Sequence, residues 1–170
     1  MASRRVWLGL GSNLEQPLAQ LTRAIQALQA LPDSRFLRCS SFYRSRPMGD
    51  VVQADFINAV AEIETTLSAI GLLDVLQGIE HAQGRQRLQH WGPRTLDIDI
   101  LTYGKEKIDN ARLTVPHAGI MEREFVLYPL AELAPDLEIP GLGSVTDLLR
   151  SCPRSGLKRL ETDTDETAGA

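Results

Sequence analysis

The chain has 170 residues, of which 43% are hydrophobic and 24% are charged, a composition typical of one globular domain with a sizeable core. The last ten residues hold four of the 22 acidic residues and no Lys or Arg, so the rest of the chain balances 18 acidic against 18 basic residues. That balance argues against a nucleic-acid-binding protein, which usually carries a strong basic excess.

Two further features bear on where the protein works. The chain has only two cysteines, Cys39 and Cys152, which is too few for a disulfide framework or a zinc site. The apolar run Val6 to Leu10 is too short for a signal-peptide core or a membrane span. We therefore expect a cytoplasmic protein that binds neither nucleic acid nor membrane. We also expect it to be a monomer.

Hydrophobic periodicity predicts the elements of the first hundred residues. The predicted strands are residues 6–10, 35–44, 56–64 and 95–103. The predicted helices are amphipathic, and they are residues 17–31 and 68–84. A Pro- and Gly-containing loop, residues 45–55, separates the second and third strands.

The order strand, helix, strand, strand, helix, strand predicts an α+β fold of the ferredoxin-like βαββαβ kind, an antiparallel sheet with helices on one face. After residue 104 we expect an added hairpin, a helix over about 119–133 and a short helix over 145–150. These elements form one predicted domain, residues 1–153. The polar, acidic residues 154–170 are predicted to be a mobile tail.

The strongest local signal is a pair of acids in the predicted strand 95–103. Because side chains alternate along a strand, the apolar residues share one face, and Asp97 and Asp99 share the other. Two carboxylates so close together repel each other unless a cation lies between them. Magnesium prefers a few carboxylates together with phosphate oxygens and water. The pair is a candidate magnesium site, and the spacing alone also fits a solvated strand face.

Three arginines, Arg85, Arg87 and Arg94, precede the acid pair. Guanidinium groups beside a metal-binding pair suit a ligand with several phosphates, because they neutralise the phosphate charge that the metal does not. The alternative is an exposed basic loop that pairs with surface acids. The chain has no Gly-Lys-Ser or Gly-Lys-Thr, so a Walker-type phosphate loop is excluded.

A second candidate site concerns a flat ligand. In the predicted strand 56–64, Phe56 and Asn58 lie on the face opposite the apolar residues, which is the face expected for Asp97 and Asp99. A Phe there can stack on a heterocycle, and an Asn can donate to and accept from its edge. The alternative is a Phe that a loop covers.

Six short motifs occur in order between about Val6 and Pro140. They are Gly9-Leu10-Gly11-Ser12-Asn13-Leu14, Ser40-Ser41-Phe42-Tyr43-Arg44, Asp55-Phe56-Ile57-Asn58-Ala59, Gly84-Arg85-Gln86-Arg87, the run Trp91 to Ile100, and Leu113-Thr114-Val115-Pro116-His117. Each motif alone is modest, but the set in this order is highly specific. The chain resembles the 6-hydroxymethyl-7,8-dihydropterin pyrophosphokinases of folate biosynthesis.

The resemblance implies an activity and its reactants. The β,γ-diphosphate of ATP would pass to the hydroxymethyl group of the pterin, giving AMP and the pterin diphosphate. Asp97 and Asp99 would hold two magnesium ions. They would form the catalytic set together with Arg85 and Arg94, which would stabilise the moving phosphates.

The resemblance also implies the two substrate sites. Phe56 and Phe125 would sandwich the pterin ring, and Asn58 would read its edge with backbone groups of Ser45 and Met48. The positions implied for ATP are Glu80, Arg87, Trp91, Arg112, Thr114, His117 and Arg123. Two positions depart from the family pattern: His90 stands where relatives often carry Arg, and Ala118 where some carry an aromatic residue.

Two other functions stay open from the residues. A ferredoxin-like module that senses a nucleotide without chemistry would explain the basic loop but not the acid pair or the Phe and Asn. A sugar transferase with an Asp-x-Asp motif would ignore ATP.

Overall fold

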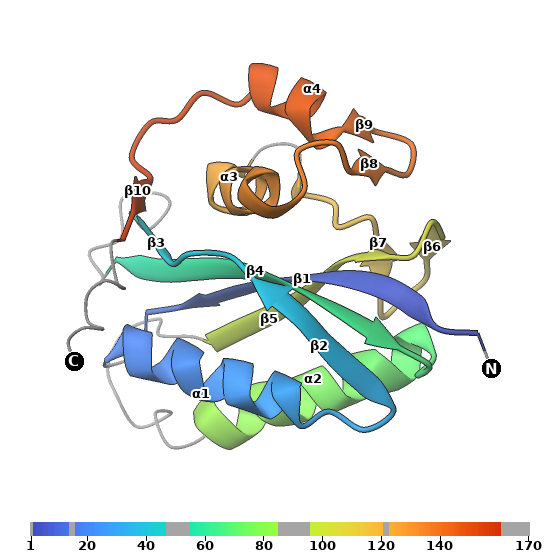
Figure 1. The fold of residues 1–170 in the computed structure, drawn as a ribbon. Helices are drawn as coiled ribbons and strands as arrows, with labels where there is room; N and C mark the ends of the chain where they lie inside the picture. Colours follow the sequence, from blue (N-terminus) through green and yellow to red (C-terminus); the bar gives the residue numbers. More distant parts are fainter. Residues whose placement is uncertain (1, 14–15, 47–54, 85–95, 121–122, 161–170) are drawn as a thin grey trace.

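The computed structural model describes residues 2–13, 16–46, 55–84, 96–120 and 123–160 (Figure 1). No helix in these ranges is long and apolar enough to cross a membrane. Most of the predicted loop 45–55, the arginine-rich segment and the last ten residues lie outside them.

One antiparallel sheet forms the centre of the molecule. Its strands are β1 (Arg4–Ser12), β2 (Ser34–Cys39), β3 (Tyr43–Ser45), β4 (Phe56–Thr65), β5 (Leu96–Tyr103) and β10 (Lys158–Arg159). Their order is β10-β3-β4-β1-β5, and β2 also pairs with β4. The expected mixed fold with an antiparallel sheet is confirmed.

The predicted single strand 35–44 is in fact two strands. β2 pairs with residues 61–65 of β4, and β3 pairs with residues 56–58. Between them Ser40 bonds Val60 in both directions: its backbone N donates to Val60 O at 2.8 Å, and its Oγ accepts from Val60 N at 2.9 Å. The serine side chain replaces a backbone acceptor there, so the regular ladder is interrupted.

Helices cover both faces of the sheet, which corrects the expectation of one covered face (Figure 1). α1 (Pro17–Gln29) and α2 (Ala69–Gly84) lie below the sheet and enclose one core with Leu8, Ile63 and Ile98. α3 (Glu124–Leu133) and α4 (Val145–Arg150) lie above it. α3 packs on the second face because that face carries the apolar side chains Trp7, Val60 and Leu101, which form a second buried core with the helix.

Two short hairpins flank α3. The added hairpin that the sequence predicts is β6 (Ile108–Asp109) with β7 (Thr114–Val115). A second hairpin, β8 (Glu138–Ile139) with β9 (Gly143–Ser144), was not predicted. The predicted helix 145–150 is α4, capped by Ser144 Oγ, which accepts from Asp147 N at 3.1 Å. α3 begins at Glu124, five residues after the predicted start.

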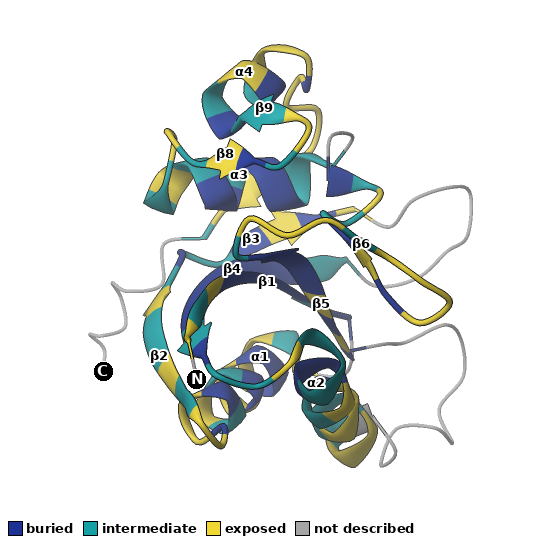
Figure 2. Ribbon diagram, turned by 90° about the vertical axis from the view of Figure 1, so that its right-hand side faces the viewer, coloured by how far each residue is buried: buried dark blue, intermediate teal, exposed yellow. Residues whose placement is uncertain are grey.

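Residues 154–160 are part of the fold, which corrects the expected start of a mobile tail at residue 154. β10 pairs with β3, Leu157 is buried, and Leu160 N donates to Phe42 O at 2.8 Å. Figure 2 shows the buried strands between the helix layers. The last ten residues are outside the described ranges.

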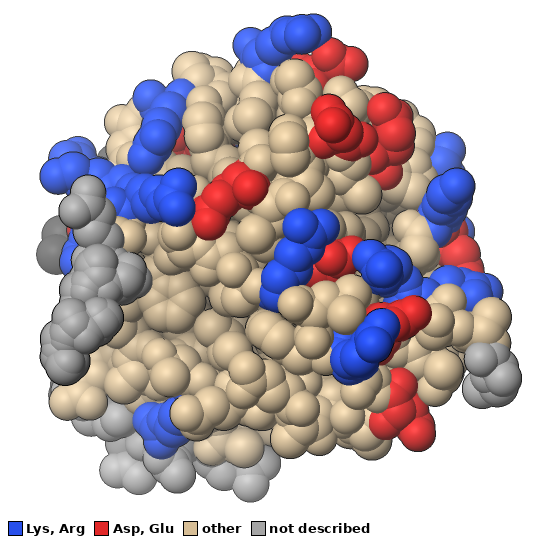
Figure 3. Space-filling view, viewed as in Figure 1, with Lys and Arg blue, Asp and Glu red and all other residues tan. Residues whose placement is uncertain are grey.

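The face that carries β2 is mixed in charge, and Figure 3 shows basic and acidic side chains interspersed there. Glu62 lies between two arginines, with Arg5 Nη1 at 3.2 Å and Arg38 Nε at 2.9 Å. Only 5% of the Glu62 side chain is exposed, so these two bonds satisfy a carboxylate that has lost most of its water. The mixed charge on this face matches the balance of acids and bases in the sequence.

Candidate functional site

A cavity of about 270 Å³ lies on the second face of the sheet, beside the N-terminal end of α3. Its floor is made by Gly9, Gly11, Asn58, Asp97 and Asp99. Its walls include Ser45, Arg46, Phe56, Arg123, Phe125 and Val126. The sheet and α3 together therefore enclose acidic, amide and aromatic side chains in one hollow.

Strand register brings the floor residues together. Gly11 of β1 pairs with Asn58 of β4 on one side and with Asp97 of β5 on the other. Gly9 pairs in the same way with Asp99. Because neither glycine has a side chain, the space between the amide and the carboxylates stays open. A Cβ on Gly11 would lie 3.1 Å from Asn58 Oδ1.

Asn58 is held by the neighbouring strand. Its Nδ2 donates to Ser45 Oγ at 2.8 Å and to Tyr43 O at 3.3 Å. The side-chain amide is buried, so these two bonds fix its plane and leave Oδ1 on the side of Gly11 and the cavity. The arrangement suits recognition of a donor on the edge of a flat ligand.

The acid pair lies on the cavity side, with Leu96, Ile98 and Ile100 packed in the opposite core. Burial raises the pKa of the Asp99 carboxyl, while the charges of His117 and Arg123 lower it. A raised carboxyl pKa means that the ionised form is poorly compensated, and a bound cation would relieve this.

The donor set fits magnesium. Within the described ranges, no group of three or more His, Cys, Asp or Glu side chains could hold a metal ion by itself. A cation at Asp97 and Asp99 therefore needs further oxygens from a ligand and water. Magnesium is coordinated in this way, by one or two carboxylates with phosphate oxygens and water.

The N-terminal end of α3 supplies a cation and a ring. Arg123 precedes the helix, and its Cζ lies 5.7 Å from the centre of the Phe125 ring. Arg123 also acts electrostatically on Asp99. One short segment thus brings a guanidinium and an aromatic ring to the acid pair.

Four of the residues expected to bind ATP lie outside this cavity, and they are Glu80, Arg112, Thr114 and His117. Arg112 Nη2 lies 2.6 Å from Asp74 Oδ1 of α2. Thr114 and His117 line a second hollow of about 360 Å³ with Ala118 and Lys107. His117 Nδ1 accepts from Gly119 N at 3.2 Å.

Glu80 lies at the edge of the sheet. Its Oε2 accepts from Ile98 N of β5 at 2.6 Å. Burial raises the pKa of the Glu80 carboxyl to about 6. The bond from Ile98 N lowers this pKa, and the charges of Asp97 and Asp99 raise it by a smaller amount. The structure therefore couples this carboxyl to the acid pair without placing it in the cavity.

The remaining predicted site residues are outside the described ranges, and their roles stay predictions. These residues are Met48, Arg85, Arg87, His90, Trp91 and Arg94.

Sequence reasoning missed Arg46 and the two floor glycines. Alternation along β1 was the available signal for the glycines, because residues 9 and 11 lie opposite the buried Leu8 and Leu10. Arg46 had no such signal, since it lies in the predicted loop.

Comparison with known proteins identifies the family. A profile described as 7,8-dihydro-6-hydroxymethylpterin-pyrophosphokinase (HPPK) matches residues 7–135. A 2-amino-4-hydroxy-6-hydroxymethyldihydropteridine pyrophosphokinase of Pseudomonas aeruginosa is 48% identical over 157 residues, 92% of this chain and 97% of that protein. The protein of the same name from Haemophilus influenzae is 51% identical and covers 85% of this chain and 90% of its own length.

Solved structures share the fold. An HPPK-DHPS structure in complex with substrates has a TM-score of 0.75 at 12% identity and covers 94% of this chain. A Plasmodium falciparum HPPK-DHPS structure has a TM-score of 0.72 at 13% identity and covers 88% of this chain. This chain spans 47% and 45% of those solved chains, respectively. The profile match and the two close relatives, which the chain covers almost completely, show that it belongs to the 7,8-dihydro-6-hydroxymethylpterin-pyrophosphokinase family.

Proposed function

We propose that the protein transfers the pyrophosphoryl group of ATP to 6-hydroxymethyl-7,8-dihydropterin, giving AMP and the pterin diphosphate, in the cytoplasm and as a monomer. The observation that carries the proposal is one cavity that combines Asp97 and Asp99 with Phe56, Asn58 and Phe125. Relatives of almost the same length carry the corresponding name.

The pterin ring would occupy the hollow between β4 and α3. Phe56 and Phe125 both line it, and aromatic side chains favour stacking on a flat ring. Asn58 Oδ1 would accept from an amino or ring N–H group, while its Nδ2 stays bonded to Ser45 and Tyr43. The backbone of Ser45 and Met48 would complete the contact with the ring edge.

Asp97 and Asp99 would hold two magnesium ions, which when bound would draw charge from the phosphates of ATP. Asp97 and Asp99 line the same cavity as Phe56, Asn58 and Phe125, so the metal site would lie beside the proposed pterin pocket. Arg123 lies beside Asp99 and would neutralise phosphate charge at the same place. Arg85 and Arg94 would stabilise the charge that develops as the group moves.

In the transfer, the hydroxymethyl oxygen forms a bond to the β-phosphorus while the bond from that phosphorus to the α–β bridging oxygen breaks, so AMP leaves and the hydroxyl proton is released to water. Positioning supplies much of the acceleration, since holding two reactants in line removes the cost of bringing them together. The residues proposed to hold ATP are Glu80, Arg87, Trp91, Arg112, Thr114, His117 and Arg123.

The strand order supports a finer classification of the fold. β5-β1-β4, with β2 and β3 on the far side of β4, is the order expected of a ferredoxin-like βαββαβ unit. We propose that residues 4–103 form this unit and that the second helix layer is an addition to it.

The first test is dependence of ATP consumption on the pterin. ATP should disappear only when protein, magnesium and the reduced pterin are all present. A nucleotide-sensing module without chemistry would leave ATP intact in every mixture, and this result would refute the proposed activity.

Gly11→Ala should weaken pterin binding. The new methyl group would lie 3.1 Å from Asn58 Oδ1 and 3.8 Å from the Phe56 ring, in the space proposed for the ligand. We expect the KM for the pterin to rise by roughly 10-fold, the effect of slightly misplacing a bound reactant. Steady-state kinetics with each substrate varied in turn measures it.

Gly78→Ala is the matched control. Gly78 lies in α2, and nothing lies within 4 Å of a Cβ built on it. Alanine there should stabilise the helix by about 0.5–1 kcal/mol and leave both KM values unchanged. Equal kinetics for the two variants would show that the floor at Gly11 is not covered by substrate.

A further inference from the structure

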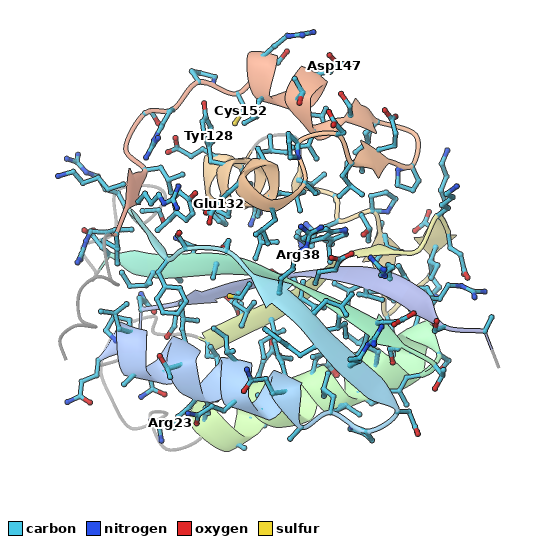
Figure 4. The ribbon with its side chains drawn as sticks, in the orientation of Figure 1. Arg23, Arg38, Tyr128, Glu132, Asp147 and Cys152 are labelled. Carbon is cyan, nitrogen blue, oxygen red and sulfur yellow. The ribbon has the colours of Figure 1, made fainter. Side chains whose placement is uncertain are left out.

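The C-terminal end of α3 is fastened to the sheet through one carboxylate, Glu132. Its Oε1 accepts from Tyr43 OH at 2.7 Å, and its Oε2 accepts from Ser41 N and Ser41 Oγ, both at 3.0 Å. Figure 4 labels Glu132 on α3, with Tyr128 and Cys152 toward the outer layer. Tyr43 is buried, so its hydroxyl depends on this acceptor.

Glu132 and the ring-binding Phe125 share one side of the helix. They are seven residues apart, which is close to two turns, so their side chains project in nearly the same direction. Glu132 reaches β3 from that side, while Phe125 lines the cavity. The bonds of the Glu132 carboxylate therefore fix the rotation of α3 about its own axis and the distance from β3 of the helix side that carries Phe125.

The bond between Tyr43 and Glu132 also bears on Asn58, which lies on the floor of the cavity. Tyr43 O accepts from Asn58 Nδ2 at 3.3 Å, and Ser45, two residues further along β3, accepts from the same amide group. Through Tyr43, Glu132 is thus linked to Asn58 as well as to Phe125. Two groups proposed to contact the pterin, from different elements, depend on one side chain.

The second anchor at this end of α3 is different in kind. Arg38 Nη1 donates to Leu133 O at 3.0 Å, a favourable contact for a helix C-terminus. At the other end, Arg123 makes no side-chain capping bond. Glu124 accepts from Ser155 N at 2.7 Å, which ties that end to the C-terminal segment and not to β3. Among these contacts, only those of Glu132 link α3 to β3, the strand to which the Asn58 amide donates.

We propose that Glu132 is a positioning residue for the pterin half of the site. It touches no substrate; it holds Phe125 and Asn58 at the separation that the ring requires. This inference rests on the proposed function, since it assigns Phe125 and Asn58 to one ligand.

The test compares Glu132→Gln with Tyr43→Phe. In Glu132→Gln, an NH₂ group faces the donors of Ser41 and Tyr43, so the fastening weakens without loss of side-chain volume. The KM for the pterin should rise about 10-fold while the KM for ATP stays within about twofold. Tyr43→Phe removes one donor and should shift the same constant in the same direction. Because Glu132→Gln already disturbs the Tyr43–Glu132 bond that Tyr43→Phe removes, the double variant should be no worse than Glu132→Gln.

A second readout does not depend on turnover. Hydrogen–deuterium exchange of residues 123–133 in the substrate-free protein should be faster in Glu132→Gln than in the wild type. Asp147→Asn is the control, because it removes a carboxylate on α4 that pairs only with Arg150 among the described ion pairs. It should change neither exchange nor either KM.

The outcomes separate the two proposals. If the wild type consumes no ATP with the pterin but binds it, the transfer activity is wrong, and the ratio of pterin Kd values still tests Glu132. If the wild type does not bind the pterin, both proposals are wrong. Unchanged exchange and unchanged pterin affinity in Glu132→Gln, or an equal rise of both KM values, would overturn the positioning role.

Discussion

Asp97→Asn should lower kcat by roughly 100-fold or more, since losing even an indirect partner of a metal ligand often costs 10- to 100-fold. The amide keeps the shape of the side chain and removes its charge, so the loss would report the role of the carboxylate in holding cations. Asp97→Ala should be at least as poor. The measurement is initial rate at saturating ATP, magnesium and pterin.

The same change should not destabilise the protein. Asp97 and Asp99 project on one face of β5, and the charge of each raises the pKa of the Glu80 carboxyl. Removing the Asp97 charge relieves its repulsion of Glu80, so the free energy of unfolding should stay equal or increase. Asp136→Asn, an exposed carboxylate after α3, is the matched control and should keep the wild-type rate. A near-normal rate in Asp97→Asn would remove the metal site from the mechanism.

Asn58→Ala should have the second largest effect, and it should act on the pterin alone. The change removes the acceptor on the cavity side and leaves Ser45 Oγ and Tyr43 O without their donor. Leaving buried polar groups unpaired costs about 1–3 kcal/mol, and the lost contact with the ring adds to it. We expect kcat/KM for the pterin to fall roughly 30- to 150-fold, which corresponds to about 2–3 kcal/mol.

The ATP constants serve as the internal control for Asn58→Ala. The residue lies on β4, across Gly11 from the acid pair, so the KM for ATP should change by less than about twofold. Equal losses for both substrates would indicate a general collapse of the cavity. No loss for the pterin would place its ring elsewhere.

Period-two alternation was enough to predict the two faces of β4 and β5. It separated Asp97 and Asp99 from Leu96, Ile98 and Ile100, because a strand leaves its side chains only two directions. The motifs added what alternation cannot: the order of six short segments identified the family, which the profile match confirms.

The second helix layer was not predictable from local patterns. Trp7, Val60 and Leu101 come from three different strands, and each lies next to apolar residues of the opposite face in its own segment. Only the sheet register places them together, and register is a property of strand pairing across long separations. For this reason the face that was expected to be open has α3 on it, and Phe125 reaches the cavity from above.

Two further errors can be traced to particular residues. Ser40 interrupts the strand 35–44 through its hydroxyl, and a serine carries no pattern that distinguishes this use from an ordinary exposed one. β10 has only two residues, both exposed, and it lies in a polar segment whose large apolar residues are Leu157 and Leu160. Composition therefore predicted a tail where long-range pairing with β3 forms a strand.

The most direct test of the transfer reaction is the phosphorus spectrum of its products. Wild-type protein with ATP, magnesium and the reduced pterin should give AMP and a pterin ester with two coupled phosphorus signals, in equal amounts. ADP together with a pterin ester that has a single phosphorus signal would contradict the account, because the cavity would then transfer one phosphoryl group as an ordinary kinase does.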